Sequence, residues 1–419
     1  MLTRHAWRGG WRDGLAYGGL GLPLAFVALP LYVVLPNHYA SAYGVPLAAL
    51  GAVLLGARAL DALVDPLIGR WADALFARSP QRAWRVLAAS ALLLALGFFA
   101  LFHPLVEGPT RLLWWCAAGL GATYLAFSGV SVIHQAWGAR LGGDEAQRAR
   151  IVAWREGLAL AGVLVASVLP GLAGMSVATL VFALLLLAGV ALLARSPRPE
   201  RPTRTQAPAS LHLPWSVPAF RRLLAIYLFN GIASAVPATL VLFFIRDRLQ
   251  VPAHEPLFLA SYFAAAALSV PLWVRGVARF GLASTWLAAM LLAITTFAWA
   301  MGLGAGDVVA FALVCVASGV ALGADLSLPA ALLTGVIQRA GHAAHAEGAY
   351  MGWWNFATKL NLALAAGLAL PSLQAFGYAP GTRDANALAA LSVAYCLLPC
   401  GLKLVAAGLL YFTWIRKEQ

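Results

Sequence analysis

Two carboxylates stand four residues apart near the end of a long apolar stretch, in the segment Arg58-Ala-Leu-Asp-Ala-Leu-Val-Asp-Pro-Leu-Ile-Gly69. This spacing places Asp61 and Asp65 on one face of a helix, with Arg58 one turn earlier. Ionisable side chains are costly inside a membrane and usually serve a function there. We therefore predict that the two acids form a coupling-ion site. The alternative is a buried salt bridge that joins two helices.

The composition indicates the kind of protein that holds these acids. Of its 419 residues, 62% are hydrophobic and only 11% are charged, whereas soluble domains average about 25% charged residues. Apolar windows of roughly 20 residues, the length that crosses a bilayer as a helix, recur along almost the whole chain. The sequence therefore predicts an all-α integral membrane protein with about twelve transmembrane helices.

The predicted spans fall into two sets of six. In the first half they lie near residues 15–35, 45–69, 86–102 and 112–137, followed by a fifth span that begins near 151 and a sixth that ends near 193. In the second half they lie near residues 223–244, 257–274, 282–303, 308–336, 350–376 and 387–411. The first span contains Pro23 and Pro30 among several glycines, which is typical of a bendable helix that lines a cavity.

Arginines are gathered in alternate loops. They precede the first span and follow the second, fourth, sixth, eighth and tenth, whereas the opposite loops carry few. The formal net charge of +13 therefore reflects membrane topology, and no nucleic-acid partner is expected. By the positive-inside rule, these loops and both termini are cytoplasmic in a multi-pass protein of the inner (cytoplasmic) membrane. The start of the chain has no small-residue cleavage site, so we expect no removable signal peptide.

A segment rich in proline and arginine, residues 196–208, separates the two sets of spans. We predict a six-helix bundle with the cation site at 1–195, a cytoplasmic linker at 196–217 and a second six-helix bundle at 218–419. This is the arrangement of the major facilitator fold, in which the two halves are related by an axis along the membrane normal. Pro66-Leu-Ile-Gly-Arg70 and Pro271-Leu-Trp-Val-Arg275 are a faint trace of the duplication.

Three further charges fall inside apolar spans of the second half. Asp325 lies in the tenth span, Lys359 in the eleventh and Lys403 near the start of the twelfth. Because a lysine at membrane depth is costly unless it is paired, we expect Lys359 to have an acidic partner. Lys403 is expected to have a structural role, with its long stem reaching toward the membrane surface.

The fourth span is polar toward its end. Ser128, Ser131 and Gln135 fall on one helix face,. The two serines are candidates for cation binding, although hydroxyl bonding between helices is an equally good interpretation for each.

Three segments resemble those of one transporter family, the glycoside-pentoside-hexuronide:cation symporters, which includes melibiose permease. They are the acid-bearing segment at 58–69, Gln147-Arg-Ala-Arg-Ile-Val-Ala-Trp-Arg155 and Glu347-Gly-Ala-Tyr-Met-Gly-Trp-Trp-Asn-Phe-Ala-Thr-Lys359. The resemblance implies the major facilitator fold and alternating access by rocking of two halves. It also implies that Asp61 and Asp65 hold the coupling cation, and that Lys359 faces the same cavity and interacts with them.

Departures from that family bear on the coupling ion. Sodium-coupled sugar members have an asparagine where this chain has Val64, and an acid on the fourth helix where this chain has Ser131. Fewer oxygen ligands favour a proton over a sodium ion, which needs several. Two serine hydroxyls could still complete a sodium shell, in which case Asp61 and Asp65 would be metal ligands. The two acids are expected to titrate as a coupled pair.

The substrate follows from a further departure. Sugar-binding members carry another acid on the first helix, whereas residues 22–26 here have none. We therefore expect an amphiphilic or anionic solute, as in the related lysolipid transporters with apolar cavities. Lys359 or Arg155 would meet its charged group. The further residues expected to line the site are Arg58, Asp325, Trp353, Trp354, Asn355 and Asn361. Interfacial anchoring is an equally good interpretation for the two tryptophans.

Other functions are less consistent with the sequence. There is no metalloprotease, nucleophile-elbow or phosphate-loop motif, so no enzyme activity and no cofactor are expected. His342, His345 and Glu347 match no metal-ligand spacing and predict a solvated loop. Alternatives that stay open are a conventional sugar symporter coupled to Na+ or H+, a passive facilitator or lipid scramblase, and a proton-coupled drug or lipid exporter with Asp325 facing a cationic substrate. A monomer is expected.

Overall fold

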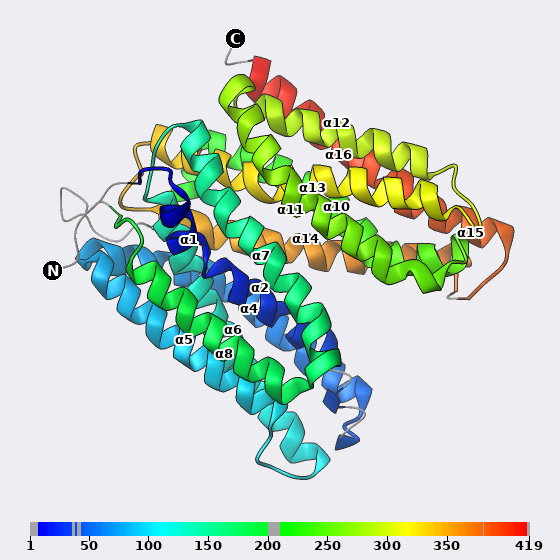
Figure 1. The fold of residues 1–419 in the computed structure, drawn as a ribbon, viewed down its shortest axis with the longest axis horizontal. Coiled ribbons are helices and arrows are strands. Elements are labelled where there is room, and N and C mark those ends of the chain that lie inside the picture. The colour runs from blue at the N-terminus through cyan, green and yellow to red at the C-terminus, as the bar shows by residue number, and fades with distance from the viewer. Residues whose placement is uncertain (1–6, 36–37, 40–42, 200–209, 380, 417–419) are drawn as a thin grey trace. The chain divides into compact units, whose positions relative to one another are not determined.

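The computed structural model describes residues 7–35, 38–39, 43–199, 210–379 and 381–416 (Figure 1). Regular structure within these ranges is helical throughout. The middle of the predicted linker, residues 200–209, lies outside the described residues.

The first group of helices contains α1 (Trp11–Gly18), α2 (Gly21–Leu29), α4 (Leu47–Arg78), α5 (Pro80–Phe102), α6 (Pro109–Ala139), α7 (Glu145–Ala173), α8 (Met175–Ala194) and α9 (Leu213–Ser216). The second contains α10 (Pro218–Phe243), α11 (Glu255–Phe280), α12 (Leu282–Ala300), α13 (Val308–Arg339), α14 (Glu347–Ala375), α15 (Ala385–Ser392) and α16 (Leu398–Leu410). Shorter helical segments are Pro30–Val34, Phe244–Arg248, Pro252–His254, Val393–Leu397 and Tyr411–Ile415.

Nine helical runs among the described residues are long and apolar enough to cross a membrane. They coincide with the predicted third to tenth and twelfth spans. The predicted first span is divided between α1, α2 and Pro30–Val34, the second lies in α4, and the eleventh lies in α14. Most of the predicted ion and coupling residues lie in two of these helices, α4 and α14.

Sequence signals account for several helix ends. Ser79 and Asp144 are N-caps whose side chains accept hydrogen bonds from the backbone N–H groups of Arg82 and Gln147, as N-cap residues do. Gly174 has a φ of 81° at the junction of α7 and α8, a conformation that favours glycine.

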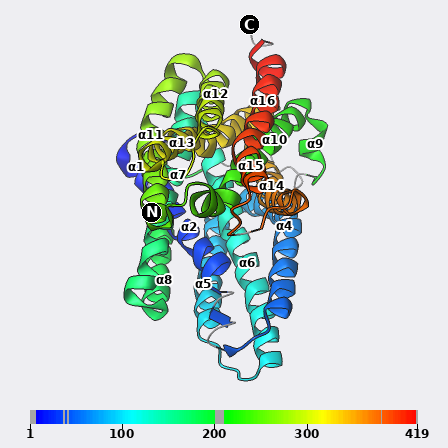
Figure 2. The same ribbon diagram turned by 90° about the vertical axis from the view of Figure 1, so that its right-hand side faces the viewer.

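The chain forms two compact units. The first comprises residues 1–216 and 334–356. In it, α6 packs along both α4 and α5, and α2 packs against α7 and α8 (Figures 1 and 2). The predicted division at 1–195 and 218–419 stays a prediction.

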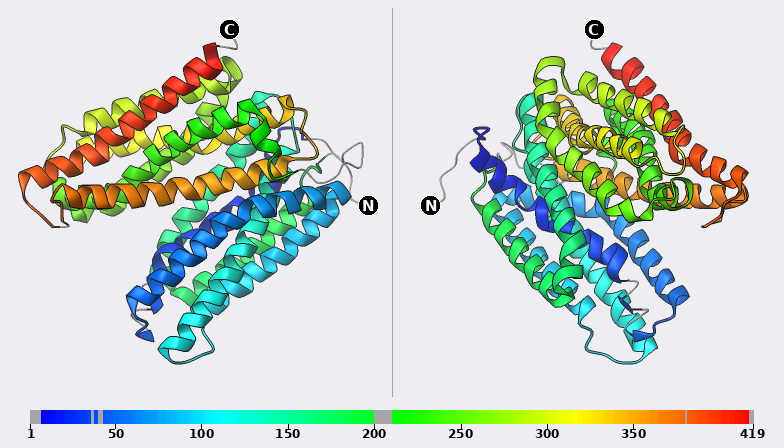
Figure 3. Two further views of the ribbon diagram at one scale, coloured as in Figure 1. Left: turned by 180° about the vertical axis from the view of Figure 1, so that it is seen from behind. Right: turned by 45° about the vertical axis from the view of Figure 1, so that its right-hand side comes forward.

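The second unit comprises residues 217–333 and 357–419. Its last long helix, α16, packs against α10 and α12 (Figure 3). Aromatic rings form much of its core: Phe244 stacks on Tyr395 with ring centroids 4.3 Å apart, and Phe258 meets Phe311 edge to face at 4.9 Å. Such pairs are favourable beyond the apolar area that they bury.

Candidate ion and substrate site

The two acids of α4 lie on its buried face. Asp61 is 3% exposed and Asp65 is fully buried, whereas Leu60, Leu63 and Leu67 are at least half exposed. The helix thus turns its leucines outward and its carboxylates inward. This is the polarity of a helix with one side in lipid and the other lining a polar interior.

One of the two candidate serines contacts an acid. The Ser128 hydroxyl of α6 donates to Asp61 Oδ1 at 2.7 Å. Ser131, one turn later, accepts a hydrogen bond from Gln135 Nε2 at 3.0 Å. The hydroxyls of one helix face therefore have different partners, and Ser128 is the one that the fold brings to the acid pair.

Arg58 and Tyr124 lie at the same end of the acid pair. Arg58 is exposed, and it interacts with the hydroxyl of Tyr124, which also lies near Asp61. Tyr124 was not anticipated from the sequence, although it is one turn before Ser128 on the same helix.

Close backbone packing positions the segment around Asp65. A Cβ added at Gly352 of α14 would lie 2.5 Å from the Asp65 carbonyl oxygen and 2.8 Å from Pro66 Cα. A Cβ at Gly348 would meet the carbonyl oxygen of Gly69 in the same way. Small residues four apart allow membrane helices to approach this closely. The first turns of α14 therefore fix the backbone that carries the second acid.

Arg155 of α7 has a carboxylate partner beside it in the sequence. Its Nε and Nη2 atoms lie 2.9 and 2.6 Å from Glu156 Oε1, and it also interacts with Tyr17. The backbone carbonyl of Tyr17 in turn lies 2.8 Å from His134 Nε2. The predicted substrate-binding arginine is therefore part of a polar cluster.

Asp325 lies in a buried polar network of the second unit. Its Oδ2 accepts from Lys403 Nζ at 2.7 Å and from Ser234 at 3.1 Å. Its Oδ1 accepts from Asn230 at 3.0 Å and from Trp286 Nε1 at 2.9 Å. Four donors fill the acceptor positions of one carboxylate.

The expectation that Lys403 extends toward the membrane surface is wrong. Its side chain is 2% exposed, and its ammonium group also donates to Asn230 Oδ1 at 2.7 Å. The reason is electrostatic, because a buried lysine is tolerable when an acid and a polar acceptor surround its charge. The sequence held a signal, because Asp325 and Lys403 are an acid and a base that each fall inside an apolar span of the second half.

The predicted residues of α14 fall into both units. Trp353 and Trp354 belong to the first unit, where Trp353 Nε1 donates to the Leu211 carbonyl at 2.9 Å and Trp354 is buried. Asn355, also of the first unit, is partly buried. Lys359 belongs to the second unit and is partly buried, so its interaction with the α4 acids stays a prediction.

Asn361 of the second unit is 4% exposed, and its Nδ2 lies 3.5 Å from the carbonyl of Tyr227. Within the described part of the chain its Oδ1 has no hydrogen-bond partner. A buried amide oxygen of this kind is a good position for a ligand donor.

A second charged cluster, which was not anticipated from the sequence, lies near the C-terminal end of α4. Arg140 Nη2 lies 2.8 Å from Asp73 Oδ1 and 2.9 Å from Glu347 Oε2, and Asp73 also accepts from the backbone N–H groups of Gly348 and Ala349. Asp73 thus binds the positive N-terminal end of α14. Glu347 is 1% exposed, so its expected place in a solvated loop is wrong.

Comparison with known proteins identifies the class. The family model described as MFS/sugar transport protein matches residues 14–417. The chain therefore belongs to this family: it is a secondary transporter, not an enzyme, with the major facilitator fold of twelve transmembrane helices in two six-helix halves. The family inferred from the three sequence segments is confirmed. A comparison with curated protein sequences found no match.

Solved structures share the fold. A bacterial homologue of the iron transporter ferroportin, in its outward-facing state, is 17% identical over 95% of this chain and 99% of that chain, with a TM-score of 0.69. The E. coli fucose:proton symporter is 13% identical over 94% and 98%, with a TM-score of 0.66. The human organic anion transporter TETRAN is 16% identical over 95% and 99%, with a TM-score of 0.67. At these identities the likeness concerns the fold alone.

Proposed function

We propose that this transporter is a symporter that couples a cation to the movement of a small solute by alternating access. The observation that carries the proposal is the buried pair Asp61 and Asp65, with the Ser128 hydroxyl bound to the first of them at 2.7 Å. Two carboxylates on one buried helix face need a compensating cation or proton. A passive facilitator or scramblase has no use for such a pair.

We favour H+ over Na+ as the coupling ion. Val64 offers no side-chain oxygen next to Asp65, and the Ser131 hydroxyl bonds Gln135. A proton needs only one carboxylate whose proton affinity is set by its neighbours, whereas a sodium ion needs several oxygen ligands. The acids alternate between protonated and ionised forms as the two halves rock.

The solute that fits this chain is amphiphilic or anionic. The first span carries no acid that could hold sugar hydroxyls. Lys359 supplies positive charge and links the ion to the solute, and Asn361 supplies a buried amide oxygen. Arg155 would have to exchange its partner Glu156 for the anionic group of the solute. The protein would work as a monomer in the inner membrane with both termini in the cytoplasm, in line with the positive-inside rule.

A sugar symporter is the second candidate, and the description of the matched family favours it. The exporter alternative is weaker, because four protein donors occupy the carboxylate of Asp325. A cationic substrate would have to displace Lys403 before it could bind there.

The deciding experiment is ligand-induced thermal stabilisation of the purified protein. A panel of sugars, lysophospholipids and organic anions is tested with and without Na+ and at two pH values, since a ligand that binds the folded state raises its melting temperature. The ligand found is then used for uptake into proteoliposomes driven by a pH or a Na+ gradient. Asp65→Asn should abolish gradient-driven uptake, whereas Asp307→Asn, which alters an exposed acid between α12 and α13, should not.

Uptake that follows the pH gradient and ignores Na+ supports proton coupling. If the Asp65→Asn variant still took up the ligand, and did so without a pH or a Na+ gradient, the proposal of coupled transport would be overturned. A neutral sugar that stabilises the protein as strongly as any amphiphile or anion would replace the proposed substrate class with the second candidate.

A further inference from the structure

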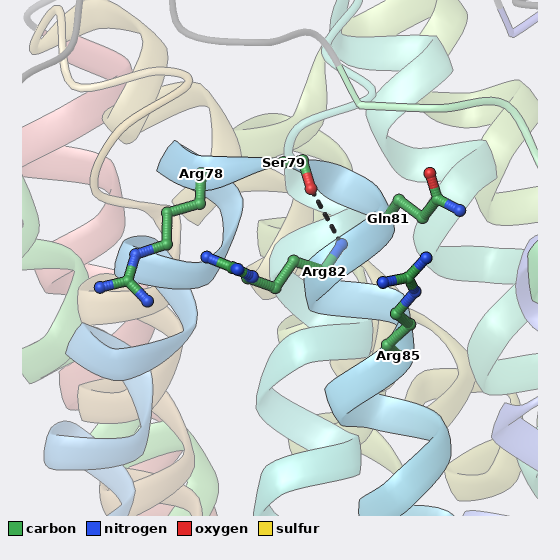
Figure 4. A pocket seen from close by; sticks show the side chains of 5 residues that line it. All are labelled: Arg78, Ser79, Gln81, Arg82 and Arg85. Carbon is green, nitrogen blue, oxygen red and sulfur yellow. Dashed lines mark hydrogen bonds between the residues drawn. The ribbon is translucent and has the colours of Figure 1, made fainter.

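Three arginines line one hollow where α4 turns into α5 (Figure 4). Arg78 is the last residue of α4, and Arg82 and Arg85 lie in the first two turns of α5. Ser79 and Gln81 complete the lining of a space of about 320 Å³, and none of the described residues that line it is acidic. The Arg82 side chain extends toward Arg78 (Figure 4).

No described carboxylate neutralises the guanidinium groups of this hollow. Arg78, Arg82 and Arg85 make no side-chain ion pair or hydrogen bond to any described residue. This distinguishes them from Arg140 and Arg155, whose charges face carboxylates. The N-terminal end of α5 adds to the positive potential. The hollow therefore favours an anion.

Guanidinium groups, rather than the helix backbone, would bind that anion. The Ser79 side chain already accepts the backbone N–H of Arg82 at 3.1 Å, and the Ser79 carbonyl accepts that of Ala83 at 3.2 Å. Each arginine presents several N–H donors in a planar arrangement that matches phosphate oxygens.

An exposed apolar stripe continues from the arginines along α5. Leu92, Leu96 and Phe99 follow Arg85 by 7, 11 and 14 residues, spacings that keep all four on one helix face. The three apolar side chains are each more than half exposed. A ligand bound to Arg85 by its anionic group would find hydrocarbon-compatible surface beside it.

The end of α4 has the same organisation. Trp71, Leu67 and Leu60 precede Arg78 by 7, 11 and 18 residues and therefore share its face. All three are about half exposed, and tryptophan favours the boundary between headgroups and hydrocarbon. Both helices thus present arginine, then apolar side chains, in the order of a phospholipid's phosphate and acyl chains.

We propose that this hollow binds the phosphate of an anionic phospholipid, with the acyl chains along the exposed faces of α4 and α5. Basic pockets at the ends of transmembrane helices are suited to acidic headgroups. Free phosphate would use the same arginines but would leave the apolar stripes unused. The positive-inside rule alone explains arginines in this loop, but not that three of them line one hollow next to two apolar stripes.

The test compares lipids by thermal stabilisation and native mass spectrometry of the intact protein. Wild type is titrated with phosphatidylglycerol, with phosphatidylcholine of the same acyl chains, and with inorganic phosphate. The variant Arg78→Gln/Arg82→Gln/Arg85→Gln is compared with Arg221→Gln/Arg222→Gln/Arg275→Gln, which removes the same charge from exposed arginines of α10 and α11. The second variant controls for net charge.

We expect phosphatidylglycerol to stabilise wild type and the control variant well above phosphatidylcholine. The Arg78/Arg82/Arg85 variant should bind phosphatidylglycerol on the order of a hundredfold more weakly, from about fivefold per arginine. Equal stabilisation by both lipids, or retention of phosphatidylglycerol by that variant, would overturn the proposal. Stabilisation by inorganic phosphate equal to that by phosphatidylglycerol would identify the ligand as free phosphate and overturn the lipid assignment.

Discussion

Lys403 Nζ lies 2.7 Å from Asp325 Oδ2, and both side chains are at least nine-tenths buried. Asn230, Ser234 and Trp286 also donate to the carboxylate, and Asn230 accepts from the ammonium. The network joins α10, α12, α13 and α16 with no net charge. A charge pair bonded in this way fixes the arrangement of its helices, because either charge left alone is costly.

The first prediction is that breaking this pair destabilises the protein strongly. Asp325→Asn leaves the Lys403 ammonium buried without its counter-charge, and Lys403→Met leaves the Asp325 carboxylate buried without its own. Each change should lower the free energy of unfolding by about 3–5 kcal/mol. The double variant Asp325→Asn/Lys403→Met should cost less than either single change, because no charge is left alone. Thermal unfolding in detergent measures all three.

Asp307→Asn is the control for this series, since Asp307 is exposed and its loss should change the melting temperature little. If the double variant were as unstable as the sum of the singles, the pair would not be coupled. Loss of transport in the double variant with a normal melting temperature would instead assign the pair a direct role in the transport cycle.

The second prediction separates the two serines of α6. Ser128→Ala removes the donor to Asp61, whereas Ser131→Ala removes only the acceptor of Gln135. A hydrogen bond to a charged group contributes about 1.5–3 kcal/mol, so Ser128→Ala should weaken gradient-driven uptake by on the order of tenfold or more. Ser131→Ala should leave uptake close to wild type. Equal losses in both variants would contradict the assignment of Ser128.

The third prediction concerns Arg140, which bridges Asp73 and Glu347 and also donates to the Ala344 carbonyl at 2.6 Å. Arg140→Ala leaves two buried carboxylates without their cation and should cost about 3–5 kcal/mol. Arg140→Lys restores the charge but not the planar donor geometry and should recover only part of this loss. Thermal unfolding measures the effect, with Arg150→Ala, an exposed arginine near the start of α7, as the control. Wild-type stability in Arg140→Ala would show that the cluster is not structural.

The sequence predicted the features that depend on local pattern. Hydropathy located the spans, and the spacing of Asp61 and Asp65 placed both on the buried face of α4. It did not predict the partners that only tertiary packing selects. Ser128 and Ser131 share a helix face, yet one bonds an acid and the other a glutamine. The sequence does not predict the two acidic partners of Arg140 either, because they lie 67 and 207 residues away in the chain.

The fourth prediction is a loss of stability in mild acid through His342, between α13 and α14. Burial, together with the neighbouring His345, lowers the pKa of His342, and its Nδ1 lies 2.8 Å from the Tyr350 hydroxyl. Because the folded state disfavours the protonated ring, the neutral ring contributes to stability above the ordinary pKa of about 6.5. This stability is lost as the pH falls through the lowered pKa of the folded state. His342→Gln should therefore reduce the drop in melting temperature between pH 7.5 and 5.5. The exposed His212 provides the control His212→Gln, and an equal reduction in both variants would refute the assignment.

The fifth prediction tests whether backbone packing holds Asp65 in place. In Gly352→Ala the new methyl group would lie 2.5 Å from the Asp65 carbonyl oxygen and 2.8 Å from Pro66 Cα, so α4 or α14 must move. Forcing an extra carbon into a packed contact costs about 1–3 kcal/mol, and the displaced segment carries the acid. We expect a lower melting temperature together with weakened gradient-driven uptake.

Gly401→Ala is the matched control, because nothing lies within 4 Å of a Cβ added there in α16. Alanine is favoured over glycine in a helix by up to about 1 kcal/mol, so this variant should be unchanged or slightly more stable. If Gly352→Ala had normal stability and normal uptake, α14 would be able to shift away from α4 at residue 352 without cost. The position of Asp65 would then depend on the contacts of α4 with α6 rather than on α14.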